Sequence, residues 1–175
     1  IYGDRMSILL LMKIGILSDT HNHIENLQKA LAIFKQRKIE ILIHCGDVNT
    51  PETAVNLQGF LVHYVYGNTD HAQMHIGSVV RDLNPQNSAG LVFTEEIDGV
   101  KLAATHGHLF TELEKLIADG RYPYVFHGHT HQRRDEMVGQ TRVINPGALG
   151  GTQYEPRSIC ILDLHSGDLE FIEIT

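Results

Sequence analysis

Short apolar runs alternate with a helical pattern in the first fifty residues, and this order restricts the folds open to the chain. Residues 11–17 (LMKIGIL) and 39–47 (IEILIHCGD) are apolar runs typical of strands buried on both faces. Between them, apolar residues recur at the spacing of one helical face: Ile24, Leu27, Leu31 and Phe34. Asn22 and Glu25 occupy helix-capping positions at its start. The pattern predicts parallel strands joined by a helix.

The remaining segments extend this pattern and then change it. Thr50 is placed to cap a second helix with Pro51 at its first position, and residues 61–68 (LVHYVYGN) predict a third strand. A further helix is expected to end at Gly120, before a strand in residues 124–131 (YVFHGHTH). Hairpins are expected at three glycine turns: Asp98-Gly99, Gly139 and Gly167. Parallel units followed by hairpins predict a mixed α/β sandwich.

Length and composition favour one domain in a reducing compartment. The 175 residues have 42% hydrophobic content, which is enough to bury a core, and no linker or repeat interrupts them. We therefore expect a single domain over residues 12–175, with residues 1–11 as a cloning remnant or an N-terminal extension. Cys45 and Cys160 lie within apolar runs, as packed free thiols do, and this indicates a cytoplasmic protein.

Charge and hydropathy exclude two classes of partner. The net charge of -7 argues against a broad nucleic-acid-binding face, although it permits a phosphate ester at a local cation. The most apolar run, residues 8–17, is interrupted by Lys13 and Gly15 before it reaches membrane-spanning length, so no membrane association is expected. Self-association into a homo-oligomer stays open.

Polar clusters directly follow five of the predicted strands. These clusters read SDTH, GDVN, GNTD, THGH and GHTH in chain order. Ligands of open α/β sheets gather at the carboxyl ends of parallel strands, so these loops are expected to converge on one rim. They offer seven candidate metal ligands: Asp19, His21, Asp47, Asn68, His106, His129 and His131.

These donors are oxygen atoms and imidazole nitrogens, which suit Mn, Fe, Zn, Co or Ni. Seven ligands exceed the needs of one tetrahedral ion and match two divalent ions that share a bridging carboxylate. Asp19 and Asp47 supply only two negative charges against four positive ones, so the site is expected to attract an anion such as a phosphate ester. A metal-bound hydroxide would then be the nucleophile.

The order DTH, GD, GN, HGH and GHTH, with a later NPGALGG, resembles the signature of the calcineurin-like metallophosphoesterases. The resemblance runs from about Lys13 to the C-terminus and implies two packed mixed β-sheets flanked by helices, a four-layer α-β-β-α sandwich. It also implies that Asp19, His21 and His131 hold one ion, that Asn68, His106 and His129 hold the other, and that Asp47 bridges them. Manganese is the metal expected first. The short chain is similar to the small phosphodiesterase branch from bacteria and archaea.

One motif departs from the family pattern. Many members carry GNH, whose histidine contacts phosphate or protonates the leaving group, whereas this chain has Thr69 at that position. Asp70, His71 or His108 could take over this role, and the candidate catalytic residues are Asn68, Asp70 and His108. Small members of the branch also tend to lack that histidine.

The histidines are expected to divide by role. His127 is interpreted as part of the strand and its supporting interactions, whereas His129 and His131 are turned toward different ions. His44, inside an apolar strand, is expected to be a hydrogen-bonded core residue. Asn145, Pro146 and Gly147 form a turn that, by family resemblance, supports the histidine loop.

The leading hypothesis is a two-metal phosphodiesterase acting on a small phosphate ester. A phosphomonoesterase is the alternative among enzymes, and the sequence hardly separates the two. A non-catalytic scaffold with the same fold is the alternative of another class, as in the retromer-type relative of the family. Such scaffolds typically have eroded ligand sets, whereas all seven positions are intact here.

Overall fold

The computed structural model describes residues 12–175, and the expectation for residues 1–11 lies outside this part of the chain. Four α-helices are present in the described residues: α1 (Ile24–Gln36), α2 (Pro51–Ala54), α3 (Gln73–Leu83) and α4 (Phe110–Asp119). The 3-10 helix η1 (Val55–Leu57) continues α2. The strands are β1 (Lys13–Leu17), β2 (Ile41–His44), β3 (Leu61–Val65), β4 (Ser88–Gly90), β5 (Val92–Ile97), β6 (Val100–Thr105), β7 (Tyr124–Phe126), β8 (Arg133–Val138), β9 (Thr141–Pro146), β10 (Ser158–Asp163) and β11 (Leu169–Glu173).

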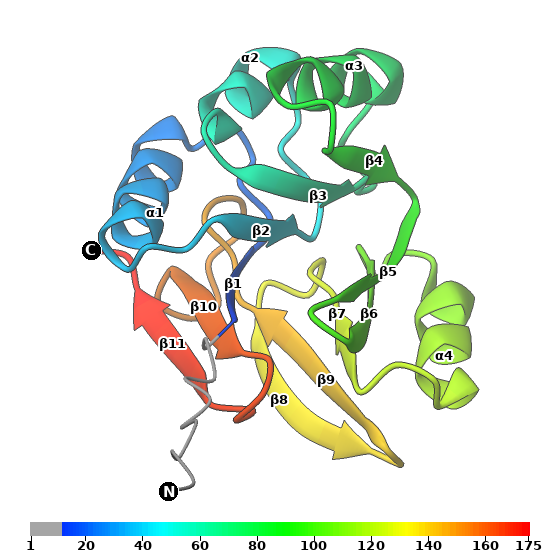
Figure 1. The fold of residues 1–175 in the computed structure, drawn as a ribbon. Helices are drawn as coiled ribbons and strands as arrows, with labels where there is room; N and C mark the ends of the chain where they lie inside the picture. Colours follow the sequence, from blue (N-terminus) through cyan, green and yellow to red (C-terminus); the bar gives the residue numbers. More distant parts are fainter. Residues whose placement is uncertain (1–11) are drawn as a thin grey trace, which may run out of the picture.

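The strands form two mixed sheets (Figure 1). The six-stranded sheet has the order β11-β10-β1-β2-β3-β4, in which β1 to β4 are parallel and β10 and β11 are antiparallel additions. The five-stranded sheet has the order β5-β6-β7-β9-β8, with a parallel centre and an antiparallel strand at each edge. The expected change from parallel units to hairpins is confirmed.

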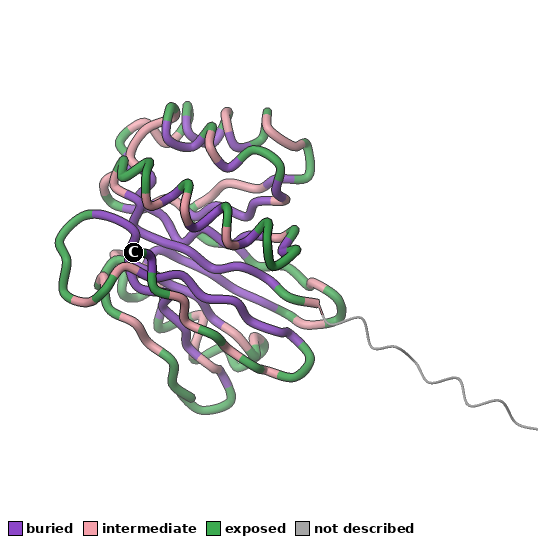
Figure 2. Tube along the Cα trace, turned by 90° about the vertical axis from the view of Figure 1, so that its left-hand side faces the viewer, coloured by how far each residue is buried: buried purple, intermediate pink, exposed green. Residues whose placement is uncertain are grey.

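Apolar residues fill the space on both sides of the six-stranded sheet. One buried cluster joins its outer face to α1, α2 and α3, and includes Leu27, Phe34 and Val62. A second lies between the sheets and includes Ile16, Phe126 and Ile144. A smaller cluster under α4 covers the outer face of the five-stranded sheet. The layers are therefore α, β, β and α, as expected, and the central strands are buried along most of their length (Figure 2).

The helix ends confirm most of the capping predictions and correct one. Thr50 accepts a hydrogen bond from the Thr53 amide with Pro51 at the first position of α2, and Gly120 ends α4 in a left-handed conformation. The expected cap of α1 is wrong, because its N-cap residue is His23, whose side chain makes no capping hydrogen bond. The Asn22 carboxamide oxygen instead accepts hydrogen bonds from the hydroxyls of Thr50 and Thr53.

The three predicted hairpins are present. The turn residues of the first, Asp98-Gly99, explain why it could be predicted from the sequence. Asp98 and Gly99 both have positive φ angles, of 50° and 78°, as a two-residue hairpin turn requires. The strand expected in residues 124–131 is shorter than expected, because β7 ends at Phe126. The His127 amide still donates to the Ile144 carbonyl, so pairing with β9 continues for one residue beyond the strand. No helix of the described residues is long and apolar enough to cross a bilayer.

Candidate metal centre

The loops that follow β1, β2, β3, β6 and β7 meet at one rim of the two sheets. These are the ends at which the polar clusters were expected, and together they carry all seven candidate ligands. Asp19 and His21 follow β1, Asp47 follows β2 and Asn68 follows β3. His106 follows β6, while His129 and His131 follow β7.

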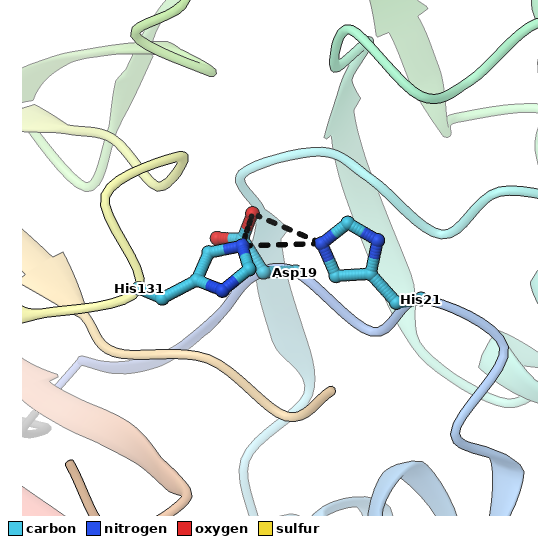
Figure 3. Close-up of side chains that lie close together, drawn as sticks. All are labelled: Asp19, His21 and His131. Carbon is cyan, nitrogen blue, oxygen red and sulfur yellow. Dashed lines mark hydrogen bonds and ion pairs between the residues drawn. The ribbon is translucent and has the colours of Figure 1, made fainter. Parts of the chain in front are cut away.

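Asp19, His21 and His131 form one compact group of donor atoms (Figure 3). Asp19 is fully buried, and its Oδ1 lies 3.2 Å from His131 Nε2 and 3.7 Å from His21 Nε2. Its Oδ2 accepts hydrogen bonds from the Ser18 hydroxyl at 2.6 Å and from the His129 amide at 3.0 Å. Oδ1 is buried without a hydrogen-bond partner among the described residues. A buried carboxylate oxygen left free in this way suits a cation.

The two imidazoles of this group face each other in an arrangement that also suits a cation. Their Nε2 atoms are 3.2 Å apart. The Nδ1 atom of His131 lies 2.8 Å from the Thr152 carbonyl oxygen and donates to it, so a neutral His131 presents a lone pair at Nε2. Two nitrogen atoms and one carboxylate oxygen therefore point at the same space. This donor set fits a divalent metal ion.

Asp47, His106 and Asn68 lie together beside this first group. Asp47 Oδ2 is 3.3 Å from His106 Nε2 and 3.6 Å from His21 Nε2, so this oxygen lies between the two sets of donors. Asn68 Oδ1 is 3.1 Å from His106 Nε2. The Nδ1 atom of His106 donates to the Cys45 carbonyl oxygen at 2.6 Å, which leaves Nε2 as the donor atom for an ion.

His129 is the candidate ligand whose side chain has the fewest contacts with the other candidate ligands. Its main-chain amide is fixed on Asp19, and its ring lies edge-on to His106 with the ring centroids 5.2 Å apart. In the described residues it belongs to neither compact group of donor atoms, which comprise Asp19, His21 and His131 and, separately, Asp19, Asp47 and His106. The structure thus brings the His129 ring to the edge of the site.

Local electrostatics keep both carboxylates in the ionised form that metal binding needs. Burial raises the pKa of Asp19, but the neighbouring imidazoles of His131 and His21 outweigh this and lower it below its ordinary value. Burial also raises the pKa of Asp47, and hydrogen bonding with His106 again lowers it overall. Burial lowers the pKa of His106, whereas Asp47 and Asp19 raise it to a higher net value.

Backbone strain is concentrated at the candidate ligands. Five of the seven have a positive φ angle, between 44° and 67°: Asp19, His21, Asp47, His129 and His131. Non-glycine residues adopt this region rarely, and such strain persists only where the surrounding structure holds it. Strain of this kind at so many polar residues points to a functional site.

Two glycines let neighbouring loops approach the first group closely. A Cβ atom at Gly128 would overlap the Ser18 hydroxyl and would lie 2.5 Å from Asp19 Oδ2. A Cβ atom at Gly151 would lie 2.5 Å from His21 Cδ2 and 2.6 Å from His131 Cε1. The loop that carries Gly151 also supplies the Thr152 carbonyl that orients His131. This loop therefore helps to position the His131 side chain in the site.

Asp70, a sequence-predicted catalytic residue, is a hub of hydrogen bonds. Its buried carboxylate accepts hydrogen bonds from the amides of Asp47, Asn49 and Gly67 and from the Tyr64 hydroxyl. Four donors leave it little capacity to protonate a leaving group, whereas they fix the loops that carry Asp47 and Asn68. Thr69 donates its amide to Asp47 Oδ1 and its hydroxyl to Asn49.

The histidine loop rests on a buried network that includes His127 and Asn145. Asn145 and Pro146 lie at the end of β9 rather than in the expected turn, because both pair with β8. Asn145 donates from Nδ2 to the Gly128 carbonyl and the Thr130 hydroxyl, and its Oδ1 accepts from the Gly147 amide. His127 Nδ1 donates to the Gly128 carbonyl, and its Nε2 lies 3.4 Å from an Arg134 guanidinium nitrogen. Burial lowers the pKa of His127 to about 4, so it stays neutral.

We expect His127→Ala and His129→Ala to differ in metal content. Both ring nitrogens of His127 are engaged by other protein groups, so its loss should leave two ions bound per chain with an affinity lower by about 10-fold. Loss of the His129 ring should remove one ion. Elemental analysis after gel filtration in Mn²⁺ measures both contents. Equal loss of metal in the two variants contradicts this division.

His44 is a core histidine, as predicted. Its Nε2 donates to the Thr20 hydroxyl at 2.9 Å, and its Nδ1 accepts from the Gly46 amide at 3.2 Å. Burial lowers its pKa to about 4. The folded chain therefore binds fewer protons at this position than the unfolded chain below the ordinary histidine pKa of about 6.5.

His44→Gln is expected to reduce the sensitivity of folding to acid. The stability contributed by neutral His44 is fully present above about pH 6.5 and is lost as the pH falls from there toward 4. At pH 5 this loss is about 2 kcal/mol. Between pH 7 and pH 5, the metal-free variant should lose about 2 kcal/mol less of its unfolding free energy than the parent chain. Urea unfolding in chelator tests this, and parallel losses contradict it.

Comparisons with known proteins agree with this geometry. Residues 12–167 match the model of the calcineurin-like phosphoesterase superfamily domain. The phosphodiesterase MJ0936 of Methanocaldococcus jannaschii is 38% identical over 154 residues, which cover 87% of this chain and 93% of that protein. The solved structure of an archaeal phosphodiesterase superposes with a TM-score of 0.86 at 38% identity, covering 93% of this chain and 99% of the other.

A more distant structure shares the fold. The phosphoesterase Yfce from E. coli superposes with a TM-score of 0.65 at 20% identity, and the match covers 94% of this chain and all of the other. The match to the family model and the archaeal relative both span most of the residues that the structure describes. The chain belongs to the calcineurin-like phosphoesterase superfamily.

Proposed function

We propose that this chain is a metal-dependent phosphodiesterase that hydrolyses small phosphate esters. The observation that carries the proposal is the position of Asp47 Oδ2, which lies 3.6 Å from His21 Nε2 and 3.3 Å from His106 Nε2. One carboxylate oxygen between two sets of donors matches a site for a pair of ions. The 38% identity to an archaeal protein named as a phosphodiesterase supports the substrate class.

Two ions would be held by the seven predicted residues. Asp19, His21 and His131 would hold one ion and Asn68, His106 and His129 the other, with Asp47 as the carboxylate shared between them. When bound, divalent ions supply positive charge for the phosphoryl oxygens and lower the pKa of a water molecule. We propose manganese as the native metal, with nickel, zinc, iron and cobalt as alternatives that suit the same donors.

The protein residues orient the substrate and the ligands. Asp70 positions the Asp47 and Asn68 loops through its four hydrogen bonds. Asn68 is exposed at the edge of the site, where it can contact a phosphoryl oxygen as well as an ion. The His108 ring lies 5.4 Å from the His106 ring and 6.3 Å from the His129 ring, which places it for contact with the phosphate or the leaving group.

A comparison of diester and monoester substrates tests the reaction class. With Mn²⁺ present, bis-p-nitrophenyl phosphate should be hydrolysed with a kcat/KM at least about 10-fold above that of p-nitrophenyl phosphate. A phosphomonoesterase, the alternative enzyme, gives the reverse order. The leaving group is the same in both esters, so the comparison reports how the site accepts the second substituent.

The intact donor set favours an enzyme over a non-catalytic scaffold. Every candidate ligand lies at the rim, and Asp19 Oδ1 is left free for a cation. We also propose that residues 12–175 act as one domain, and that the protein works in the cytoplasm, where its buried Cys45 and Cys160 stay reduced. Absence of both metal binding and esterase activity would support the scaffold instead.

A further inference from the structure

A pocket of about 800 Å³ opens beside the candidate metal centre. Its lining includes Asn68 and His108, which the proposed function places next to the phosphate. Residues 71–75, at the start of α3, also line it. A volume of this size lies within the range of about 300–1,000 Å³ found for small-molecule sites. The pocket therefore extends well beyond the reacting phosphate group and has room for an organic substituent.

The lining of this pocket offers flat rings, a polarizable sulfur atom and amides. The side chains that contribute them are His71, His75, His108, Met74, Asn68 and Gln73. Imidazole rings present flat faces to a ring, and a thioether makes favourable contacts with aromatic rings. The amides supply donors and acceptors for the polar edge of a heterocycle. This combination suits a planar aromatic group.

The charges around the pocket exclude two other kinds of substituent. Its lining in the described residues has no lysine or arginine, so a second phosphate would lack a permanent cationic partner there. Its one carboxylate, Asp70, is already engaged by four donors and is buried, so a cationic substituent would find no free anion. A neutral, flat group matches the lining better than either.

We propose that this pocket binds an aromatic substituent of the phosphate ester, such as a nucleobase or an aryl ring, and that Met74 and His75 help to determine this specificity. The inference rests on the proposed function only in taking a phosphate ester as the ligand at the neighbouring rim. Met74 is 83% exposed, so its replacement should not disturb the core.

Binding measurements with three probes test the proposal without relying on turnover. The Mn²⁺-loaded protein is titrated by calorimetry with inorganic phosphate, ribose 5-phosphate and adenosine 5′-monophosphate. The last two share the phosphate and the sugar and differ only in the base. Adenosine 5′-monophosphate should bind at least about 10-fold more tightly than ribose 5-phosphate, since one stacked base contributes on this scale.

Variants locate the base in the pocket. Replacement of both Met74 and His75 by alanine should reduce the advantage of the nucleotide to less than about threefold, with ribose 5-phosphate affected less than about twofold. Met137→Ala is the matched control, because Met137 is also exposed, at 60%, and is not part of the pocket lining. This control should keep the full advantage.

The outcomes separate this inference from the proposed function. Equal affinity for the nucleotide and ribose 5-phosphate, including no binding of either, overturns the inference even if bis-p-nitrophenyl phosphate is hydrolysed. An advantage that survives the double replacement also overturns it, because the base then binds elsewhere. An advantage that depends on Met74 and His75 supports the pocket even in a protein that hydrolyses no diester, and only the proposed function then fails.

Discussion

Asp47→Asn should lower kcat/KM for bis-p-nitrophenyl phosphate by at least about 1,000-fold, equal to about 4 kcal/mol of transition-state stabilisation. The Asp47 carboxylate is the group that faces both His21 and His106, so the amide removes the negative charge between the two proposed ions. The amide oxygen can still accept from the Thr69 amide, so the loop should keep its shape. Initial rates with saturating Mn²⁺ measure the effect, and bound metal should fall below two ions per chain.

Asp168→Asn is the matched control for this substitution. It makes the same change of charge at an exposed residue in the turn between β10 and β11, away from the rim. Its kcat/KM should stay within about twofold of the parent value, as is usual for surface substitutions. Undiminished hydrolysis by Asp47→Asn contradicts the bridging role.

Gly128→Ala should abolish most of the activity although it adds only a methyl group. That methyl group would overlap the Ser18 hydroxyl and approach Asp19 Oδ2, so Asp19 or the histidine loop must move. A shift of about 1 Å near the chemistry lowers rates by about 100-fold. We expect a loss of at least this size, together with weaker binding of the ion held by Asp19, His21 and His131. Steady-state kinetics and calorimetric titration with Mn²⁺ give the two values.

Gly90→Ala separates this steric effect from a general effect of replacing glycine. A Cβ atom at Gly90 would meet only the Val92 carbonyl oxygen, at 3.4 Å, and Gly90 has no positive φ angle. This variant should keep the parent activity and metal affinity. Equal activity of the two alanine variants would mean that the close approach of Gly128 to Asp19 has no functional role.

The sequence predicted the layout of the site because two strong regularities apply to it. Continuous apolar runs identify strands buried on both faces, and parallel strands direct their carboxyl ends to one rim. Asp19, Asp47 and Asn68 each follow such a run, so the sequence alone predicted that they lie close together. The hairpin at Asp98-Gly99 was equally readable, because its turn residues tolerate positive φ angles.

Other features depend on contacts between distant segments and could not be predicted in the same way. Asp70 belongs to a polar cluster in the sequence, but its role follows from donors on three segments, among them the Tyr64 hydroxyl. The left-handed backbone at His129 and His131 could likewise not be predicted, because most histidines do not adopt this conformation. Asn22 does not cap α1 as expected, because its side-chain oxygen accepts hydrogen bonds from Thr50 and Thr53 instead.

The helix α3 was missed although the sequence carried a signal for it. Ile76, Val80 and Leu83 recur at helical spacing, but Gly77 interrupts the segment and weakens the pattern. The structure gives a reason for this glycine, because a Cβ atom there would overlap the Tyr66 hydroxyl. The first residues of α3 line the pocket proposed to bind an aromatic substituent. The pocket could therefore not be predicted without this helix.

The most direct test of the two-ion account is a titration of metal-free protein with Mn²⁺ in which bound metal and hydrolysis of bis-p-nitrophenyl phosphate are measured together. The account predicts that two ions bind per chain, that the metal-free protein is inactive, and that most of the activity appears as the second ion binds. Full activity with one bound ion per chain, or in the metal-free protein, would contradict it.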